Sequence, residues 1–263
     1  MFNNTQIMAI MNLTPDSFYA NSRMESLQKV VDKAGAFIEE GASIIDIGGQ
    51  STRPGAIMIS EEEEIERVSG SIESISKAFP TVKVSIDTFQ SKVAKAAIEA
   101  GATIVNDISC GSFDPDILEV VAQYKVGYIG MHITGTKDTM HVIPERTDII
   151  EELIHFFTQK KQLLADKGIQ DWVIDPGFGF GKTIQDNFTI IKDLRKLAII
   201  QLPILIGVSR KSSIYKTLGI SAEEALNGTT VVNTIALKNG ASILRVHDVK
   251  EARQAITLME YLQ

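Results

Sequence analysis

Polar side chains follow three short apolar runs of this sequence, at the point where each run ends. Asp87 follows VKVSI, Asn106 follows ATIV, and Asp175 follows WVI. Carboxylate and carboxamide groups both offer oxygens that accept hydrogen bonds, so together they suit a flat ligand that carries several N–H donors. We therefore expect these three residues to recognise an amino-substituted heterocycle.

Basic side chains follow two further apolar runs, PILIG and SILR. They are Arg210, Lys211, Arg245 and His247. Arginine offers a planar fork of donors that matches phosphate oxygens, and lysine offers a point charge. If these two runs are the last strands of a barrel, they end where phosphate groups commonly bind in that fold. The pattern predicts a phosphate site.

Each of these residues also has an ordinary structural explanation. Asp87 could equally be the N-cap of a helix, Asn106 could complete a turn, and His247 could be a structural histidine with satisfied hydrogen bonds. Polar or ionisable residues also follow the other apolar runs, among them Asn12 and His132. Eight such positions in register are hard to explain by capping alone, and they favour one shared site.

The segment DPGFGFGK at 175–182 is rich in glycine but matches neither common phosphate-binding pattern. Only three residues separate Gly177 from Gly181, where a P-loop needs four, and GFGFG does not fit GxGxxG. We expect its glycines to let the backbone turn tightly and approach a flat ligand.

The sequence shows no pattern of a structural metal site. The four histidines are scattered, with no HxxxH or CxxC spacing, so a structural zinc is not expected. A magnesium ion held mostly by substrate phosphates needs few protein ligands, so a magnesium site remains an open possibility.

Cys110 is the only cysteine, which rules out an intrachain disulfide and fits a reducing cytoplasm. We interpret it as a small residue in a turn.

Eight apolar runs, several of them rich in valine and isoleucine, have the composition of buried parallel strands. They cover residues 6–11, 43–48, 82–86, 102–105, 126–131, 172–174, 203–207 and 242–245. Amphipathic helical patterns lie between them, at 27–38, 61–79, 90–99 and 150–157, and Gly41, Gly101 and Gly168 stand where helices end. The alternation predicts an α/β fold, a single (β/α)8 TIM barrel over 1–263, with an open doubly wound sheet as the alternative. The two longest loops, 12–23 and 49–60, are expected to be functional.

The composition excludes several classes of protein. The chain has 263 residues, 44% of them apolar, and a net charge of −7, so a broad basic surface for nucleic acid is not expected. The first residues show neither a basic segment nor a long apolar stretch, so we expect no signal peptide, no membrane span and no membrane partner.

Seven segments in order along the chain resemble the successive motifs of dihydropteroate synthases. They are IMNLTPDSF, DIGGQSTRPGA, VSIDTF, NDIS, DPGFGFGK, GVSRKS and RVHDV. The resemblance implies a cytoplasmic, homodimeric TIM-barrel transferase of folate biosynthesis. Such an enzyme condenses 6-hydroxymethyl-7,8-dihydropterin pyrophosphate with 4-aminobenzoate, giving 7,8-dihydropteroate and pyrophosphate by a dissociative, SN1-like substitution. Mg²⁺ is the expected cofactor, and sulfonamides would occupy the aminobenzoate site.

The resemblance also implies a role for each matching position. Asp87, Asp175 and Lys211 would be the catalytic residues. The pterin would be bound by Asp87, Asn106, Met131, Asp175 and Lys211. The pyrophosphate would be bound by Asn12, Thr52, Arg245 and His247, with Asn12 at the metal. The aminobenzoate site would comprise Thr52, Arg53, Pro54, Phe180, Ser209 and Lys211.

The sequence departs from the family in its loops. Residues Tyr19–Arg23 replace the usual Ser-Asp-Gly-Gly stretch, Gln50 replaces a glutamate, and MHITGTKDTM lacks the common basic or amide residue and proline. Two other interpretations remain. A pterin-binding methyltransferase domain on the same barrel would share the pterin-reading residues but would have no use for STRPG and SRKS. A catalytically silent pterin-binding barrel would release no pyrophosphate.

Overall fold

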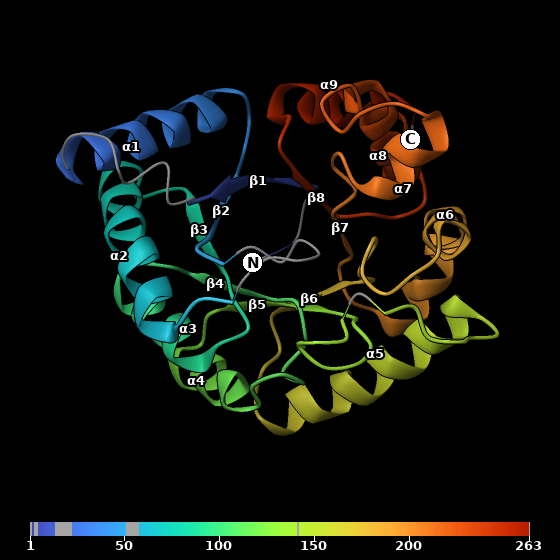
Figure 1. The fold of residues 1–263 in the computed structure, drawn as a ribbon, viewed down its shortest axis with the longest axis horizontal. Coiled ribbons are helices and arrows are strands. Elements are labelled where there is room, and N and C mark those ends of the chain that lie inside the picture. The colour runs from blue at the N-terminus through green and yellow to red at the C-terminus, as the bar shows by residue number, and fades with distance from the viewer. Residues whose placement is uncertain (1, 3–4, 14–22, 51–57, 141, 263) are drawn as a thin grey trace.

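The protein is a closed ring of parallel strands surrounded by helices (Figure 1). The computed structural model describes residues 2, 5–13, 23–50, 58–140 and 142–262. The strands are β1 (Gln6–Asn12), β2 (Ile44–Gly48), β3 (Lys83–Asp87), β4 (Ile104–Asp107), β5 (Gly127–Met131), β6 (Trp172–Asp175), β7 (Leu205–Ile206) and β8 (Ile243–Val246). All eight predicted strands are confirmed, with ends that differ by one or two residues.

The order of the strands in the sheet is β6-β5-β4-β3-β2-β1-β8-β7, so neighbours in sequence are neighbours in space. The first strand pairs with both β2 and β8. A parallel bridge between Ile174 and Ile204 joins β6 to the start of β7 and completes the ring. The closed ring confirms the TIM barrel and excludes the open doubly wound sheet.

Helices pack around the outside of the ring (Figure 1). They are α1 (Arg23–Glu39), α2 (Glu61–Ala78), α3 (Ser91–Glu99), α4 (Asp116–Tyr124), α5 (Ile149–Asp166), α6 (Ile184–Asp193), the 3₁₀ helix η2 (Leu194–Ile200), α7 (Ser212–Leu218), α8 (Leu226–Lys238) and α9 (Val249–Glu260). The four predicted helices are α1, α2, α3 and α5. Gly101 follows the C-cap of α3 with a φ of 117°, a left-handed conformation that favours glycine.

Apolar side chains close the bottom of the barrel. The barrel floor, as we call this cluster, consists of Phe2, Met8, Ile44, Ile104, Ile129, Val173, Leu205 and Ile243. A second and larger core fills the space between the strands and the outer helices.

Among the described residues, no helix has both the length and the apolar character needed to cross a membrane.

The floor determines where the functional side chains stand. Successive side chains of a strand point to opposite faces, so residues two apart share a face. Seven floor residues lie on strands, and the residues two positions after them are Ile10, Asp46, Asn106, Met131, Asp175, Gly207 and Arg245. Four of these seven are polar. The strand period therefore places a polar layer (Asp46, Asn106, Asp175 and Arg245) directly above an apolar floor.

Candidate active site

Arg245 links three side chains of different strands inside the barrel. Its Nε donates to Asp46 Oδ2 at 2.7 Å, and its Nη2 donates to Asp87 Oδ2 at 2.6 Å. The Asn106 amide donates to the same Asp46 oxygen at 3.1 Å. Asp87 also pairs in register with Asn106 across β3 and β4. The structure thus brings together Asp87, Asn106 and Arg245, which the sequence had placed at the ends of separate strands.

Asp46 is a member of this cluster that sequence reasoning missed. It is 0% exposed, and among the described residues its Oδ1 has no hydrogen-bond partner. The signal was present in the sequence, because Asp46 stands two residues after the floor residue Ile44 in an otherwise apolar strand. Asp46 lies in the middle of β2, so a search of the strand ends alone does not find it.

The charges of this cluster depend on one another. Burial raises the pKa of Asp87 to about 7, and the nearby guanidinium of Arg245 opposes the rise. Burial also disfavours the charge of Arg245, but the carboxylates of Asp46 and Asp87 outweigh that effect and raise its pKa. Arg245 is therefore a permanent cation, whereas Asp87 can change its protonation state near neutral pH.

Asp175 and Lys211 form a second part of the site. Asp175 Oδ1 accepts a hydrogen bond from the backbone N–H of Gly177 at 2.8 Å, and the Lys211 amine donates to the carbonyl of Phe178. Burial raises the pKa of Asp175, with the charge of Lys211 opposing it. Burial lowers the pKa of Lys211 to about 8, with Asp175 opposing. The two side chains thus stabilise each other's charged form.

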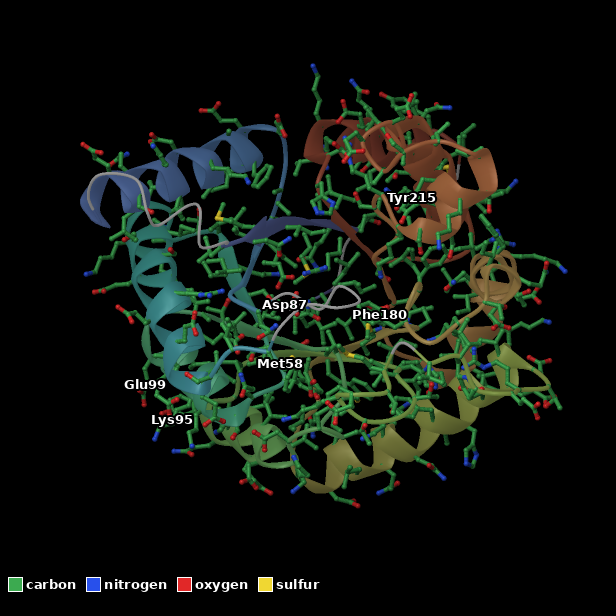
Figure 2. The ribbon with its side chains drawn as sticks, viewed as in Figure 1. Met58, Asp87, Lys95, Glu99, Phe180 and Tyr215 are labelled. Carbon is green, nitrogen blue, oxygen red and sulfur yellow. The ribbon has the colours of Figure 1, made fainter. Side chains whose placement is uncertain are left out.

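Phe180 lies beside Lys211, whose Nζ is 4.6 Å from the centre of the ring. The ring also packs against a small apolar cluster that contains the buried Met131. In Figure 2, Asp87 and Phe180 lie towards the middle of the ring of strands, whereas Glu99 and Tyr215 belong to outer helices. The structure thus places Phe180, a predicted aminobenzoate residue, beside Lys211, and Asp175, a predicted pterin residue, near the same amine.

Ser209 and His247 come together where β7 and β8 end. The Ser209 hydroxyl is 3.1 Å from His247 Nδ1 and accepts the backbone N–H of His247 at 3.2 Å.

Arg210 has a different role from its neighbours. Its guanidinium pairs with both carboxylate oxygens of Asp248, at 2.7 and 2.9 Å. The sequence grouped Arg210 with the phosphate-binding bases, but this bidentate pair engages it in joining the β7–α7 turn to the start of α9.

Asn12 is exposed at the end of β1. Its Oδ1 and Asp87 Oδ2 lie 3.5 and 3.6 Å from the point where a Cβ on Gly48 would stand, so both oxygens border the same space. The predicted aminobenzoate residues Thr52, Arg53 and Pro54 lie outside the described residues. So does most of the atypical segment 19–23.

Comparison with known proteins agrees with this geometry. The family model of pterin binding enzymes matches residues 8–247. The dihydropteroate synthase of Synechocystis sp. is 40% identical over 261 residues, which cover 98% of this chain and 90% of the relative. The Escherichia coli enzyme is 39% identical over 256 residues, covering 97% and 90%.

Solved structures show the same similarity in three dimensions. Xanthomonas albilineans dihydropteroate synthase with 4-aminobenzoic acid is 35% identical, with a TM-score of 0.90, over 100% of this chain and 94% of that one. The enzyme from the same organism in complex with 7,8-dihydropteroate is 32% identical, with a TM-score of 0.88, over 100% and 95%. The chain thus belongs to the pterin-binding enzyme family, and within it to the dihydropteroate synthases.

Proposed function

We propose that this chain condenses 6-hydroxymethyl-7,8-dihydropterin pyrophosphate with 4-aminobenzoate, and that the residues gathered around Lys211 and Arg245 carry the reaction. The observation that supports this most is the convergence of Asp87, Asn106, Asp175 and Lys211 at one end of the barrel, beside Phe180. The similar Xanthomonas albilineans structures hold 4-aminobenzoic acid and 7,8-dihydropteroate, a substrate and the product of that condensation.

The pterin ring would be read by acceptors that the protein has already oriented. Asn106 uses its amide nitrogen on Asp46, which leaves its carbonyl oxygen to accept from the ligand. Asp175 uses Oδ1 on the Gly177 N–H, which leaves Oδ2. Lys211 retains N–H donors beyond the one given to Phe178 for the acceptors of the pterin. Met131 would pack beside the ring.

The chemical step in this proposal is a dissociative substitution at the pterin methylene carbon. The bond from that carbon to the pyrophosphate oxygen breaks, and the leaving group takes the electron pair. Arg245 and His247 would offset the growing negative charge, while the Asp175 carboxylate stabilises the cation delocalised into the dihydropterin. The amine nitrogen of 4-aminobenzoate then forms the new bond, and the arylammonium produced releases its proton to water or to the departing pyrophosphate. Holding the two substrates in line supplies much of the acceleration.

Magnesium is proposed as the cofactor. The described residues contain no group of three or more histidine, cysteine, aspartate or glutamate side chains that could hold a metal ion. One exposed amide oxygen, that of Asn12, borders the same space as Asp87. This sparse set of oxygens fits an ion held mainly by substrate phosphates and water, with Asn12 as its protein ligand. When bound, the ion would neutralise pyrophosphate charge.

The aminobenzoate would lie between Phe180, Ser209 and Lys211, together with Thr52, Arg53 and Pro54.

We also propose a homodimer in the cytoplasm. The exposed Val231 and Ile235 on α8 support self-association, because they lie one helical turn apart on one face. The free, buried thiol of Cys110 supports a reducing compartment.

Product analysis tests the proposed activity. The purified protein, given both substrates and Mg²⁺, should form dihydropteroate and pyrophosphate in equal amounts. A methyltransferase on this barrel would need a methyl donor and would release no pyrophosphate. A silent barrel would bind the pterin and form neither product, so either result would refute the proposal.

A further inference from the structure

Side chains from several parts of the barrel hold the glycine-rich loop between β6 and α6. Each of five successive backbone groups of residues 177–181 has its own side-chain partner. The partners, in the order of the loop residues, are Asp175, Lys211, Asn187, Lys182 and Arg146. These bonds restrain the backbone of the loop along its whole length, because each of its residues has a side-chain partner.

Lys182 lies at the base of this loop and has no part in the mechanism above. Its side chain is buried, with 7% of the residue exposed. Its Nζ donates to the Phe180 carbonyl at 3.1 Å and to the His132 carbonyl, just beyond β5, at 3.4 Å. A Cβ on Gly177 would stand 3.0 Å from this Nζ and 2.1 Å from the His132 oxygen. The amine thus joins the end of β5 to the loop where the two backbones are in close contact.

Burying this amine costs free energy. Burial and, to a smaller extent, the nearby guanidinium of Arg146 together lower the pKa of Lys182 to about 7. An apolar residue would fill the space without that cost. The contacts of the amine, rather than its contribution to packing, therefore give the best reason for a lysine here.

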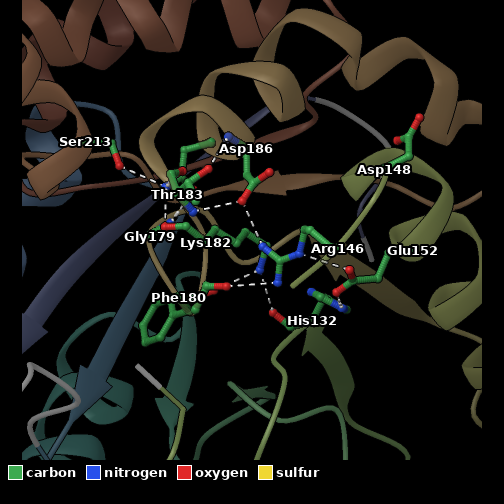
Figure 3. A network of polar contacts seen from close by, with 12 residues as sticks. His132, Arg146, Asp148, Glu152, Gly179, Phe180, Lys182, Thr183, Asp186 and Ser213 are labelled. Carbon is green, nitrogen blue, oxygen red and sulfur yellow. Dashed lines mark hydrogen bonds and ion pairs between the residues drawn. The ribbon is translucent and has the colours of Figure 1, made fainter. Parts of the chain in front are cut away.

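Arg146 holds the other end of the loop, as Figure 3 shows. Its Nη2 donates to the Gly181 carbonyl at 2.9 Å, its Nη1 to Asp186 Oδ2 at 3.0 Å, and its Nε to Glu152 Oε2 at 3.0 Å. Asp186 in turn completes the capping box of α6. Lys182 and Arg146 thereby fix two neighbouring carbonyls, those of Phe180 and Gly181.

We propose that Lys182 is a positioning residue for the arylamine substrate. By holding the carbonyl of Phe180, it fixes the backbone from which the Phe180 ring extends towards the Lys211 amine. The inference rests on the proposed function, because it assumes that 4-aminobenzoate binds beside Phe180. Among the described residues, the Lys182 amine donates to the carbonyls of His132 and Phe180 and to none of the proposed pterin-binding side chains. Its loss should therefore affect one substrate more than the other.

Steady-state kinetics of Lys182→Met test this proposal. Methionine keeps much of the length and apolar volume of lysine but donates no hydrogen bond. Because a pKa of about 7 leaves the Lys182 amine only partly charged at neutral pH, loss of its hydrogen bond corresponds to about a tenfold change in an equilibrium constant. We expect the KM for 4-aminobenzoate to rise by about tenfold or more, with the KM for the pterin pyrophosphate within about twofold of wild type. The matched control is Lys192→Met, which changes an exposed lysine of α6 and should alter neither KM.

Equal changes in both KM values, or an unchanged KM for 4-aminobenzoate, would overturn the positioning role. The wild-type assay separates this failure from failure of the proposed function, since an inactive wild type contradicts the function itself. If Lys182→Met is not recovered folded, Lys182→Gln tests the role with a smaller effect, because its shorter amide can replace at most one of the two bonds: the KM for 4-aminobenzoate should still rise, and that for the pterin pyrophosphate should not. A purely structural lysine would lower the melting temperature of either variant without the difference between substrates.

Discussion

Asp46 and Arg245 form a partly buried ion pair at 2.7 Å in the barrel, although 199 positions separate them in the chain. The same Asp46 oxygen accepts the amide of Asn106, so one carboxylate orients a candidate pterin acceptor and a candidate phosphate donor. The closed ring of strands makes this possible, because it brings β2, β4 and β8 around one interior.

Replacing Asp46 with asparagine should therefore affect both substrate-binding groups without any direct contact to the arylamine. The variant keeps the shape of the side chain but removes its charge, which leaves Arg245 paired with Asp87 alone. We expect the KM for the pterin pyrophosphate to rise by about tenfold or more, and the free energy of unfolding in urea to fall by about 1–3 kcal/mol. Asp32→Asn, an exposed change in α1, is the control. A wild-type KM in the Asp46 variant would contradict the orienting role.

The period of the strands would have been enough to predict Asp46 from the sequence. Ile44 and Asp46 share a face of β2, and the same offset of two relates Ile104 to Asn106 and Ile243 to Arg245. The barrel and most of its polar interior follow from this alternation together with the eight apolar runs. Local periodicity is thus sufficient for residues on strands.

Residues in turns were harder to predict, because their partners are distant in sequence. Arg210 adjoins Lys211, but its positive φ of 54° and its contact with Asp248 give it a separate environment. Lys182 ends a motif in which the sequence predicts roles for Asp175, Phe180 and the glycines but not for the lysine, and its His132 partner lies 50 residues away. Neither contact produces a periodic signal, so only the folded backbone reveals it.

Replacing Asp175 with asparagine should lower turnover far more than binding. Asparagine can still accept the Gly177 N–H through its carbonyl oxygen, so the loop keeps its anchor. The negative charge that stabilises the pterin cation is lost, and removal of one such electrostatic group costs about 10²–10³ in kcat. The binding of a sulfonamide or another aminobenzoate analogue, measured by calorimetry, should change by less than about threefold. Unaltered turnover would refute the role of Asp175.

The affinity for the pterin should depend on pH through Asp87. Its pKa lies at about 7, so the carboxylate is protonated below that value and loses capacity to accept N–H donors. We expect pterin affinity to increase as pH rises through about 7, by up to about tenfold per pH unit below it, and then to level off. Asp87→Asn should bind more weakly and show no transition near this pH. A transition of equal size in the variant would assign it to another group.

Folding stability should respond to acid through His132. Burial lowers the pKa of this histidine from 6.5 to about 4, with its Glu152 partner opposing the change. The unfolded chain therefore binds a proton at a pH where the folded protein does not, and unfolding gains free energy from it. The part of the free energy of unfolding that depends on a neutral His132 is fully present above pH 6.5 and is lost as pH falls towards 4.

The difference between those two pKa values corresponds to about 3 kcal/mol of folding stability. Urea unfolding of wild type between pH 4 and 7 should therefore show a steeper loss of stability than that of His132→Gln, whose side chain does not titrate. The control is His155→Gln, which changes an exposed histidine of α5 and should follow the wild-type curve. Parallel curves for wild type and His132→Gln would show that folding does not change the protonation of His132, and they would contradict the prediction. A shallower loss of stability in wild type than in His132→Gln would instead show a charged His132–Glu152 pair, which stabilises the fold on acidification through the histidine range.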